Sequence, residues 1–448
     1  MTNPRQLVLN AFLMSNGHHE AAWRLPESDP FIGTDVDHWI ELARLAERGR
    51  LDSVFFADSP GLWAGSETVA RRPSQTLEPS LLLSAMAQAT SRVGLIATAT
   101  TTYDEPFNTA RRFATLDKLS HGRAGWNVVT TASLAASANF GYAEPPTHAE
   151  RYARANEYLD VVLGLWDGWD DDAEIGDKAS GMHTDPGKVR RLDHRGEHFQ
   201  VSGPLNVGRS EQGHPVIVQA GSSVPGMALA ARYAEAVFTA QRTLELGQGF
   251  YSELKAATRA AGRDSDHIKI LPGVVPILGS TEEEAHKLER RLDELIVLDH
   301  PLAQLSADIG IPVEQIDLDA PLPRDIRSAD EIEGNRTRYE LTVEFARRDN
   351  LTVRELLWKL GGGRGHRTFT GTPEQLADDL QLWFENGAAD GFNIMAPVFP
   401  SALETFVEQV VPILQKRGLF RTEYAGSTLR EHYGLPVPVS GARRAGRG

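Results

Sequence analysis

The residues best suited to chemistry lie between positions 122 and 152. A turn of small residues leads into the apolar run 126–129, which ends on two threonines. His148 and Tyr152 follow, four residues apart, at the start of a helical pattern. Amide and hydroxyl groups at a strand end, beside an imidazole and a phenol at a helix start, can hold a phosphate group by hydrogen bonds. This combination indicates a candidate anion site, although His148 and Tyr152 could also simply pack on a helix face.

Polar side chains also lie at the predicted ends of other strands. Asp58 closes the apolar run LDSVFFA, and Thr98 lies in the threonine-rich run ATATTTY. Ser222 and Ser223 lie between a strand and a helix, and Asn127 lies near the end of its own strand. Each has a structural alternative, because Asp and Ser cap helices and Thr favours strands. Together they predict a polar ring around one end of the fold.

Several catalytic arrangements are absent from the sequence. There is no cysteine, which excludes disulfides, thiolate metal sites and a cysteine nucleophile. We find no His-Glu-x-x-His, no Gly-x-Ser-x-Gly and no dinucleotide-binding glycine motif after the first strand, and we predict no metal site. A polar ring without its own nucleophile or metal favours a bound cofactor that carries the reactive chemistry.

Net charge and the distribution of apolar residues limit the kinds of molecule that the protein can bind. The chain has 46 basic and 61 acidic residues among 448, a formal net charge of −15. Nucleic acid is therefore a poor partner, because binding it depends on cationic side chains. No apolar run is long enough to span a membrane, and the N-terminal segment lacks the zones of a signal peptide. We expect a cytoplasmic protein that acts on a small molecule.

The order of predicted elements alternates strand and helix. Strand patterns occur at 7–12, 51–57, 93–97, 124–129, 215–220, 236–239, 268–275 and 392–395. Runs that are apolar throughout indicate parallel strands buried on both faces, and eight such units at this length predict a (β/α)8 TIM barrel. In such a barrel the polar strand ends gather at one mouth.

Two segments interrupt this repeat. We interpret 167–214 and 299–370 as insertions, the second long enough to cover the barrel mouth. Residues 1–434 are predicted to form a single domain, followed by a poorly ordered tail at 435–448 that is rich in Pro, Gly and Arg.

Several separated stretches resemble the bacterial luciferase-like flavin monooxygenases. They are FATLDKLSHGRAGWNVVT, THAERY, GHPVIVQAGSS, AADGFNI and VVPILQKRGLFRTEY, in this order along the chain. The resemblance is to the group that contains the nitrilotriacetate monooxygenases, the dibenzothiophene-sulfone monooxygenases and pristinamycin synthase. It covers nearly the whole chain.

The resemblance implies a luciferase-like TIM barrel that binds reduced FMN, supplied by a separate NAD(P)H:flavin reductase. Addition of O2 would give a flavin C4a-hydroperoxide, which oxygenates a small organic substrate. It also implies a homodimer or homotetramer. By motif, the FMN contacts correspond to Asp58, Thr98, His148, Tyr152 and one or both of Ser222 and Ser223. We add Asn127 because of its place near a strand end.

The stretches TATTTYDEPF, GPLNV and RDNLTVREL are similar to component A of the nitrilotriacetate monooxygenases. This similarity implies an aminopolycarboxylate substrate, hydroxylated beside nitrogen and then cleaved at the C–N bond. Arginines would hold the carboxylates, and Arg24, Arg364 and Arg367 lie in predicted loops that could reach the mouth, although a surface position is the more common one.

Other functions stay open at this stage. An apolar pocket with Phe12, Trp63 and Trp126 near the flavin would favour an organosulfur substrate. A deazaflavin-dependent oxidoreductase and a non-catalytic flavin-binding barrel are further alternatives. The histidines of predicted loops, His18, His19 and His366, are expected at the surface.

Overall fold

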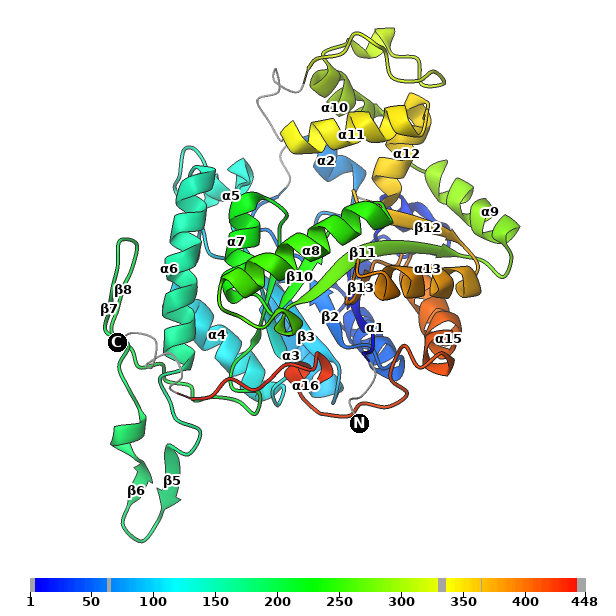
Figure 1. Cartoon of the computed structure of the whole chain (residues 1–448). Helices are drawn as coiled ribbons and strands as arrows, with labels where there is room; N and C mark the ends of the chain where they lie inside the picture. The colour runs from blue at the N-terminus through cyan, green and yellow to red at the C-terminus, as the bar shows by residue number, and fades with distance from the viewer. Residues whose placement is uncertain (1–4, 63–65, 329–335, 364, 441–448) are drawn as a thin grey trace.

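A closed parallel barrel forms the centre of the molecule. The computed structural model describes residues 5–62, 66–328, 336–363 and 365–440. Within them, eight strands follow one another around the barrel, and the last pairs with the first (Figure 1). In spatial order they are β1 (Val8–Phe12), β2 (Ser53–Phe56), β3 (Gly94–Thr100), β4 (Ala124–Val129), β9 (Val216–Ala220), β10 (Ala236–Thr239), β11 (Lys269–Leu278) and β13 (Gly391–Ile394). The predicted (β/α)8 fold is confirmed, strand by strand.

One further strand was not predicted. β12 (Arg367–Gly371) pairs in parallel with the second half of β11, from Val274↔Arg367 to Leu278↔Gly371. It lies at the end of the predicted second insertion, and it pairs only because β11 extends beyond its neighbours in the barrel.

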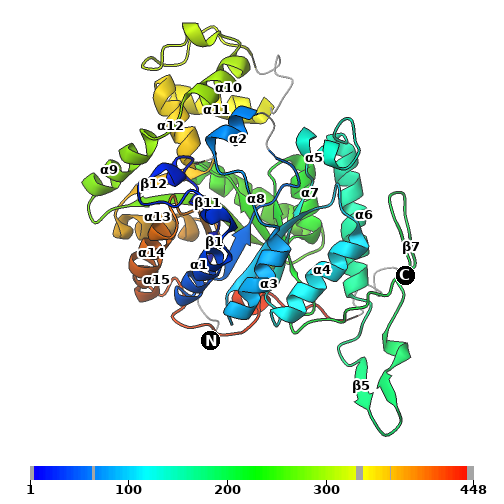
Figure 2. The ribbon, with the colours of Figure 1, turned by 180° about the vertical axis from the view of Figure 1, so that it is seen from behind.

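Helices cover the outside of the barrel (Figure 1 and Figure 2). They are α1 (Val36–Arg48), α3 (Pro79–Ala89), α4 (Pro106–Leu119), α6 (His148–Trp166), α7 (Val224–Tyr233), α8 (Leu244–Ala260), α13 (Pro373–Glu385), α14 (Ser401–Thr405) and α15 (Val411–Lys416). Local sequence explains several of the starts: Thr147 with Glu150 and Thr372 with Gln375 form capping boxes, and Ser223 caps α7. No helix in the described part of the chain is long and apolar enough to cross a membrane.

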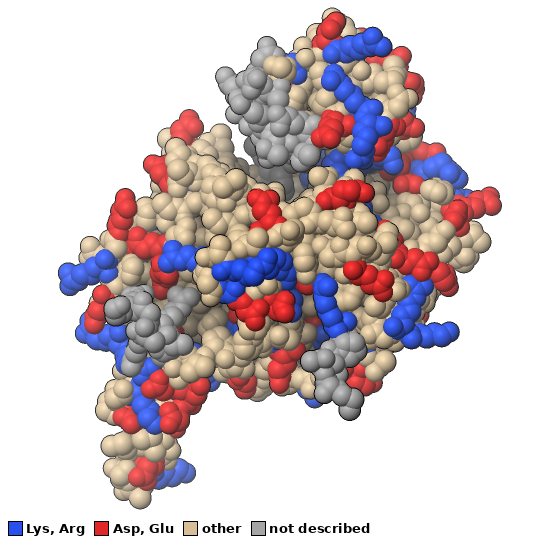
Figure 3. Space-filling model, viewed as in Figure 1, with Lys and Arg blue, Asp and Glu red and all other residues tan. Residues whose placement is uncertain are grey.

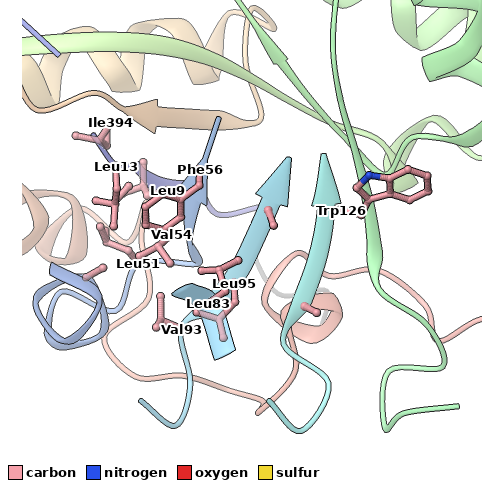
Figure 4. Close-up of a cluster of buried hydrophobic side chains, with 14 of the residues drawn as sticks. Leu9, Leu13, Leu51, Val54, Phe56, Leu83, Val93, Leu95, Trp126 and Ile394 are labelled. Atoms are coloured by element: carbon pink, nitrogen blue, oxygen red, sulfur yellow. The ribbon is translucent and has the colours of Figure 1, made fainter. Parts of the chain in front are cut away.

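The strands are apolar on both faces because each face is buried. Leu9, Val54 and Leu95 point outward and pack with residues such as Leu83 of α3 (Figure 4). The opposite faces fill the barrel interior with a second cluster, which includes Val8, Phe12, Phe55, Ile96 and Phe238. This arrangement accounts for the continuous apolar runs of the sequence.

The C-terminal segment closes the barrel at the end where the strands begin. Leu429 of α16 (Leu429–His432), Tyr433 and Leu435 belong to the interior cluster. Tyr433 donates a hydrogen bond to Asn10 Oδ1 at 3.0 Å, and Arg430 forms a buried ion pair with Glu235. Leu435 is thus packed although it begins the predicted tail. Residues 441–448 lie outside the described residues, so the tail and the domain boundary stay predictions.

The two predicted insertions lie at different sides of the molecule and have different structures. The first forms two antiparallel hairpins that project from the body, β5 (Glu174–Asp177) with β6 (Met182–Thr184) and β7 (His194–Arg195) with β8 (Gln200–Val201) (Figure 1). The second forms a helical lid, defined here as the described residues of 299–363: α10 (Asp299–Ile309), α11 (Arg336–Arg348) and α12 (Val353–Gly363). The lid has its own apolar cluster and follows α9 (Glu282–Asp293).

The lid lies over the end of the barrel where the strands end. Figure 1 and Figure 2 both place α10–α12 there, next to the short helix α2 (Ser66–Arg71). The Glu20 N–H, in the loop after β1, donates to the Gly361 carbonyl of α12 at 3.2 Å. A second short helix, α5 (Leu134–Asn139), lies on the same side near the start of α6.

Candidate active site

A polar cradle lies where α7 begins. Tyr152 Oη, from the second turn of α6, is 3.5 Å from Ser223 Oγ. Ser223 Oγ in turn accepts a hydrogen bond from the Gly226 N–H at 3.2 Å, so its position is fixed by the helix that it caps. The ring of His148 packs on that of Tyr152, with their centroids 4.8 Å apart. The structure therefore brings together three of the predicted residues at one helix start.

Two glycines keep this cradle open. A Cβ atom at Gly226 would lie 3.0 Å from Tyr152 Oη and 3.1 Å from Ser223 Oγ. A Cβ atom at Gly221 would lie 2.7 Å from Gln219 Nε2. Hydroxyl groups, an amide and the positive end of the dipole of a ten-residue helix thus face one small space. Such a space suits a phosphate group. Ser222 is exposed beside it.

A hydrogen-bonded pair occupies the neighbouring ends of β3 and β4. The Thr98 hydroxyl donates to the Phe56 carbonyl at 2.7 Å and accepts from Asn127 Nδ2 at 2.7 Å. This chain fixes the orientation of the Asn127 amide and leaves its Oδ1 buried without a hydrogen-bond partner. A buried acceptor without a donor is costly, so the site gains from a ligand that presents an N–H group there.

Gln219 of β9 shows the same feature as Asn127. Its Oε1 is buried without a hydrogen-bond partner, while its Nε2 faces the cradle. The position fell within a predicted strand end, but no motif or spacing in the sequence singled it out.

Asp58 lies two residues after β2 and is partly buried. Burial raises the pKa of its carboxyl group, and the nearby negative charge of Glu78 adds to this effect. It lies on the same side of the barrel as the pair of Thr98 and Asn127, because Thr98 is bound to the Phe56 carbonyl.

Aromatic rings line the mouth of the barrel. Phe12 meets Phe55 and Phe238 edge to face, with centroids 4.7 and 5.4 Å apart. The His18 ring packs on Phe12 at 4.6 Å, and the His366 ring stacks on Phe238 at 4.8 Å with an interplanar angle of 6°. These rings provide an apolar floor below the lid.

The predicted surface positions of His18 and His19 are wrong, and His366 is only partly exposed. His18 and His19 are 1% and 2% exposed, because the loop after β1 folds under the lid. Burial lowers the pKa of His366 to about 4, and the positive charge of Arg242 contributes. The second insertion was predicted to be long enough to cover the mouth, but no local pattern indicated that the loop after β1 would lie beneath it.

Other expectations also need correction. Trp126 points out of the barrel and packs against Phe113 and Tyr158, so it cannot line a pocket with Phe12. Arg367 pairs with Asp379 at 2.6 Å on the outer side, and Arg24 donates to the Leu295 carbonyl. Trp63 and Arg364 lie outside the described residues.

Comparison with known proteins decides the family. Residues 12–390 match the luciferase-like monooxygenase family. The chain belongs to this family. It is 49% identical over 97% of its length to N-acetyl-S-(2-succino)cysteine monooxygenase of Bacillus subtilis, covering 98% of that protein. It is 47% identical over 97% of its length to nitrilotriacetate monooxygenase component A of Aminobacter aminovorans, covering 97% of that protein.

A solved structure extends the comparison. The structure of riboflavin lyase with modified FMN and riboflavin has a TM-score of 0.83 and 30% identity, and covers 97% of each chain. The family expected from the sequence motifs is therefore confirmed, and the protein is an enzyme of the monooxygenase class. Among the described residues, no group of three or more His, Asp or Glu side chains could hold a metal ion.

Proposed function

We propose that this protein is the oxygenase component of a two-component monooxygenase that uses reduced FMN and O2. The observation that carries the proposal is the pairing of an open phosphate cradle at α7 with the buried, unpartnered Asn127 Oδ1. A cofactor with a phosphate at one end and ring N–H groups at the other fits both.

The residues present suit FMN at each end. Tyr152, Ser223 and the amide groups at the start of α7 would hold the phosphate, with His148 supporting the Tyr152 ring. Asn127 Oδ1 would accept from an N–H group of the isoalloxazine, held in place by Thr98. Asp58, beside this ring edge, and Ser222, beside the phosphate, complete the proposed set. The relative with modified FMN in its solved structure supports the choice of flavin.

Reduced FMN, when bound, supplies two electrons to dioxygen, so that one oxygen atom enters the substrate and the other leaves as water. The residues around the bound flavin have three roles. Hydrogen bonds at both ends hold the flavin in one orientation. The aromatic floor of Phe12, Phe55 and Phe238 and the lid exclude water, which protects the reactive oxygen. The remaining space under the lid orients the substrate.

For the substrate we propose an aminopolycarboxylate similar to nitrilotriacetate. Hydroxylation of the carbon between nitrogen and a carboxylate gives a carbinolamine, which breaks at the C–N bond into a secondary amine and glyoxylate. The relative from Aminobacter aminovorans supports this choice. An organosulfur substrate is the second candidate, because the relative from Bacillus subtilis acts on a carboxylated thioether and the mouth is rich in aromatic rings.

The partners are proposals of the same kind. The name of the component A relative indicates a protein with a second component, which supports a separate flavin reductase here. The homodimer or homotetramer and the cytoplasmic location expected from the sequence stay predictions.

The test is an anaerobic titration with reduced FMN, followed by a pulse of O2 in the presence of nitrilotriacetate. We expect saturable flavin binding and the release of glyoxylate in step with O2 consumption. N-acetyl-S-(2-succino)cysteine and dibenzothiophene sulfone are then tried in the same assay. Flavin binding without product from any of the three would support a flavin-binding barrel, and failure to bind FMN would refute the proposal.

A further inference from the structure

We infer that Arg242 and His366 form a subsite that binds a carboxylate group of the substrate, across the barrel from the flavin-facing pair Thr98 and Asn127. This inference rests on the proposed function and specifies how the substrate is recognised.

The placement follows from the strand order. β11 is the fourth strand from β3 in both directions around the barrel, so the two lie on opposite walls. His366 lies against the wall of β10 and β11, stacked on Phe238 and next to Gly273. A Cβ atom at Gly273 would lie 2.7 Å from His366 Nδ1, so only a glycine leaves room for the imidazole there. The ring therefore occupies the mouth itself.

Arg242 lies beside this imidazole, in the loop after β10. Its Nε donates to the carbonyl of Gly365, the residue before His366, at 3.3 Å. Its guanidinium lies over the Phe345 ring of α11, 4.5 Å from the centroid. One contact to the loop and one to the lid hold the cation between the barrel and the lid. In Figure 3, Lys and Arg side chains extend over the lid down to where it meets the barrel, with Asp and Glu side chains beside them.

The chemistry of the pair fits a carboxylate. His366 Nδ1 is buried without a hydrogen-bond partner, and its low pKa keeps the ring neutral, able to donate one hydrogen bond. Arg242 adds a permanent charge and further donors in a planar fork. A polyanionic substrate that approaches a protein of net charge −15 needs such a local cation.

Other charged residues lie around the mouth of the barrel. Arg242 helps to lower the pKa of Asp349, and that carboxylate also pairs with Arg348 at 2.7 Å. On the other side of the mouth, Arg71 and Arg72 face Asp299 and Glu20 at 3.9 and 3.5 Å.

The experiment measures carboxylate binding without turnover. Nitrilotriacetate and N-acetyl-S-(2-succino)cysteine are titrated by calorimetry, in metal-free anaerobic buffer, into the protein loaded with reduced FMN. We expect at least one tricarboxylate to bind the wild type and Arg242→Leu to raise its Kd by about 30-fold or more. His366→Phe keeps the stacked ring but removes the nitrogen, and we expect about a 10-fold rise. The affinity for reduced FMN should stay at its wild-type value in both variants.

Two controls separate recognition from a loosened lid. Phe345→Leu removes the ring beneath Arg242 but keeps the charge, and we expect its Kd to stay within about 2-fold of wild type. The trimethyl ester of nitrilotriacetate carries no negative charge, so Arg242→Leu should not weaken its binding.

Each outcome has one meaning for the subsite. Equal tricarboxylate affinity in wild type and Arg242→Leu would overturn it, and so would a wild type that binds neither tricarboxylate. A loss as large in Phe345→Leu as in Arg242→Leu would also overturn it. Arg242-dependent binding without any product after an O2 pulse would support the subsite and count against the proposed reaction instead.

Discussion

Gly226→Ala should weaken FMN binding while leaving the fold intact or slightly more stable. The new Cβ would lie 3.0 Å from Tyr152 Oη and 3.1 Å from Ser223 Oγ, whereas ordinary contacts to a Cβ begin near 3.4 Å. Both hydroxyls must therefore retreat by a few tenths of an ångström, and the methyl group occupies the space proposed for the phosphate. Gly226 lies in the first turn of α7 with no positive φ, so Ala suits its backbone.

The two expected effects have opposite signs. Replacing Gly by Ala in a helix contributes up to about 1 kcal/mol of stability. A hydrogen bond to a charged group is worth about 1.5–3 kcal/mol, so losing one such bond to the phosphate should raise the Kd for FMN by roughly 10- to 150-fold. A variant that is at least as stable and yet binds FMN poorly cannot be explained by misfolding.

The assay compares FMN with riboflavin, which lacks the phosphate. Kd values are measured anaerobically for both reduced flavins, together with the Tm of the apoprotein. We expect the preference for FMN over riboflavin to collapse in Gly226→Ala and to persist in Gly249→Ala, a helix position where a Cβ meets nothing within 4 Å. An unchanged preference in Gly226→Ala would refute the placement of the phosphate.

Three further predictions address the ring site, the closed end of the barrel and the response to acid. Asn127→Leu should weaken FMN and riboflavin to the same extent, by about 10-fold, because it removes a contact to the ring and not to the phosphate; selective loss of FMN would contradict this assignment. Arg430→Met should lower the free energy of unfolding by about 3–5 kcal/mol, measured with urea, because it leaves the buried Glu235 carboxylate unpaired, and Glu235→Gln in the same background should restore part of the loss. Because the pKa of His366 is about 4 in the folded protein and near 6.5 in the unfolded chain, the unfolded state binds more protons between these values, so this residue lowers stability as pH falls from 6.5 to 4. Over this pH range the free energy of unfolding of His366→Phe should therefore fall less than that of the wild type, by up to about 1.4 kcal/mol per pH unit. Equal slopes of the free energy of unfolding against pH in the two proteins would contradict the buried, neutral imidazole. Asp52 and Asp117, with pKa values of about 6, raise the free energy of unfolding as pH falls. Both proteins contain these carboxyl groups, so their contribution cancels in the difference between His366→Phe and the wild type.

The pattern of apolar residues in the barrel strands predicts the fold but not the direction of each side chain. Runs such as 51–57 and 124–129 are mostly apolar and show no regular alternation of apolar and polar residues, which predicted parallel strands buried on both sides and hence the barrel. Without such alternation, the sequence does not show which residues point inward. Trp126 and Asn127 are adjacent in sequence, yet one packs against the outer helices and the other faces the barrel interior. Only the register with β3 and β9 decides this alternation.

The order of elements, the family motifs and the gathering of polar strand ends at one mouth could all be predicted from the sequence. Which of these polar residues lie close enough to interact depends on the folded structure. Tyr152 and Ser223 are 71 residues apart and become neighbours because α6 and α7 are adjacent around the barrel. Arg242 bonds to Gly365, beside His366, only because the lid, which has its own hydrophobic core, returns the chain to the mouth. Such contacts depend on the closure of the barrel and on the path of a long insertion, and no local pattern of residues encodes either.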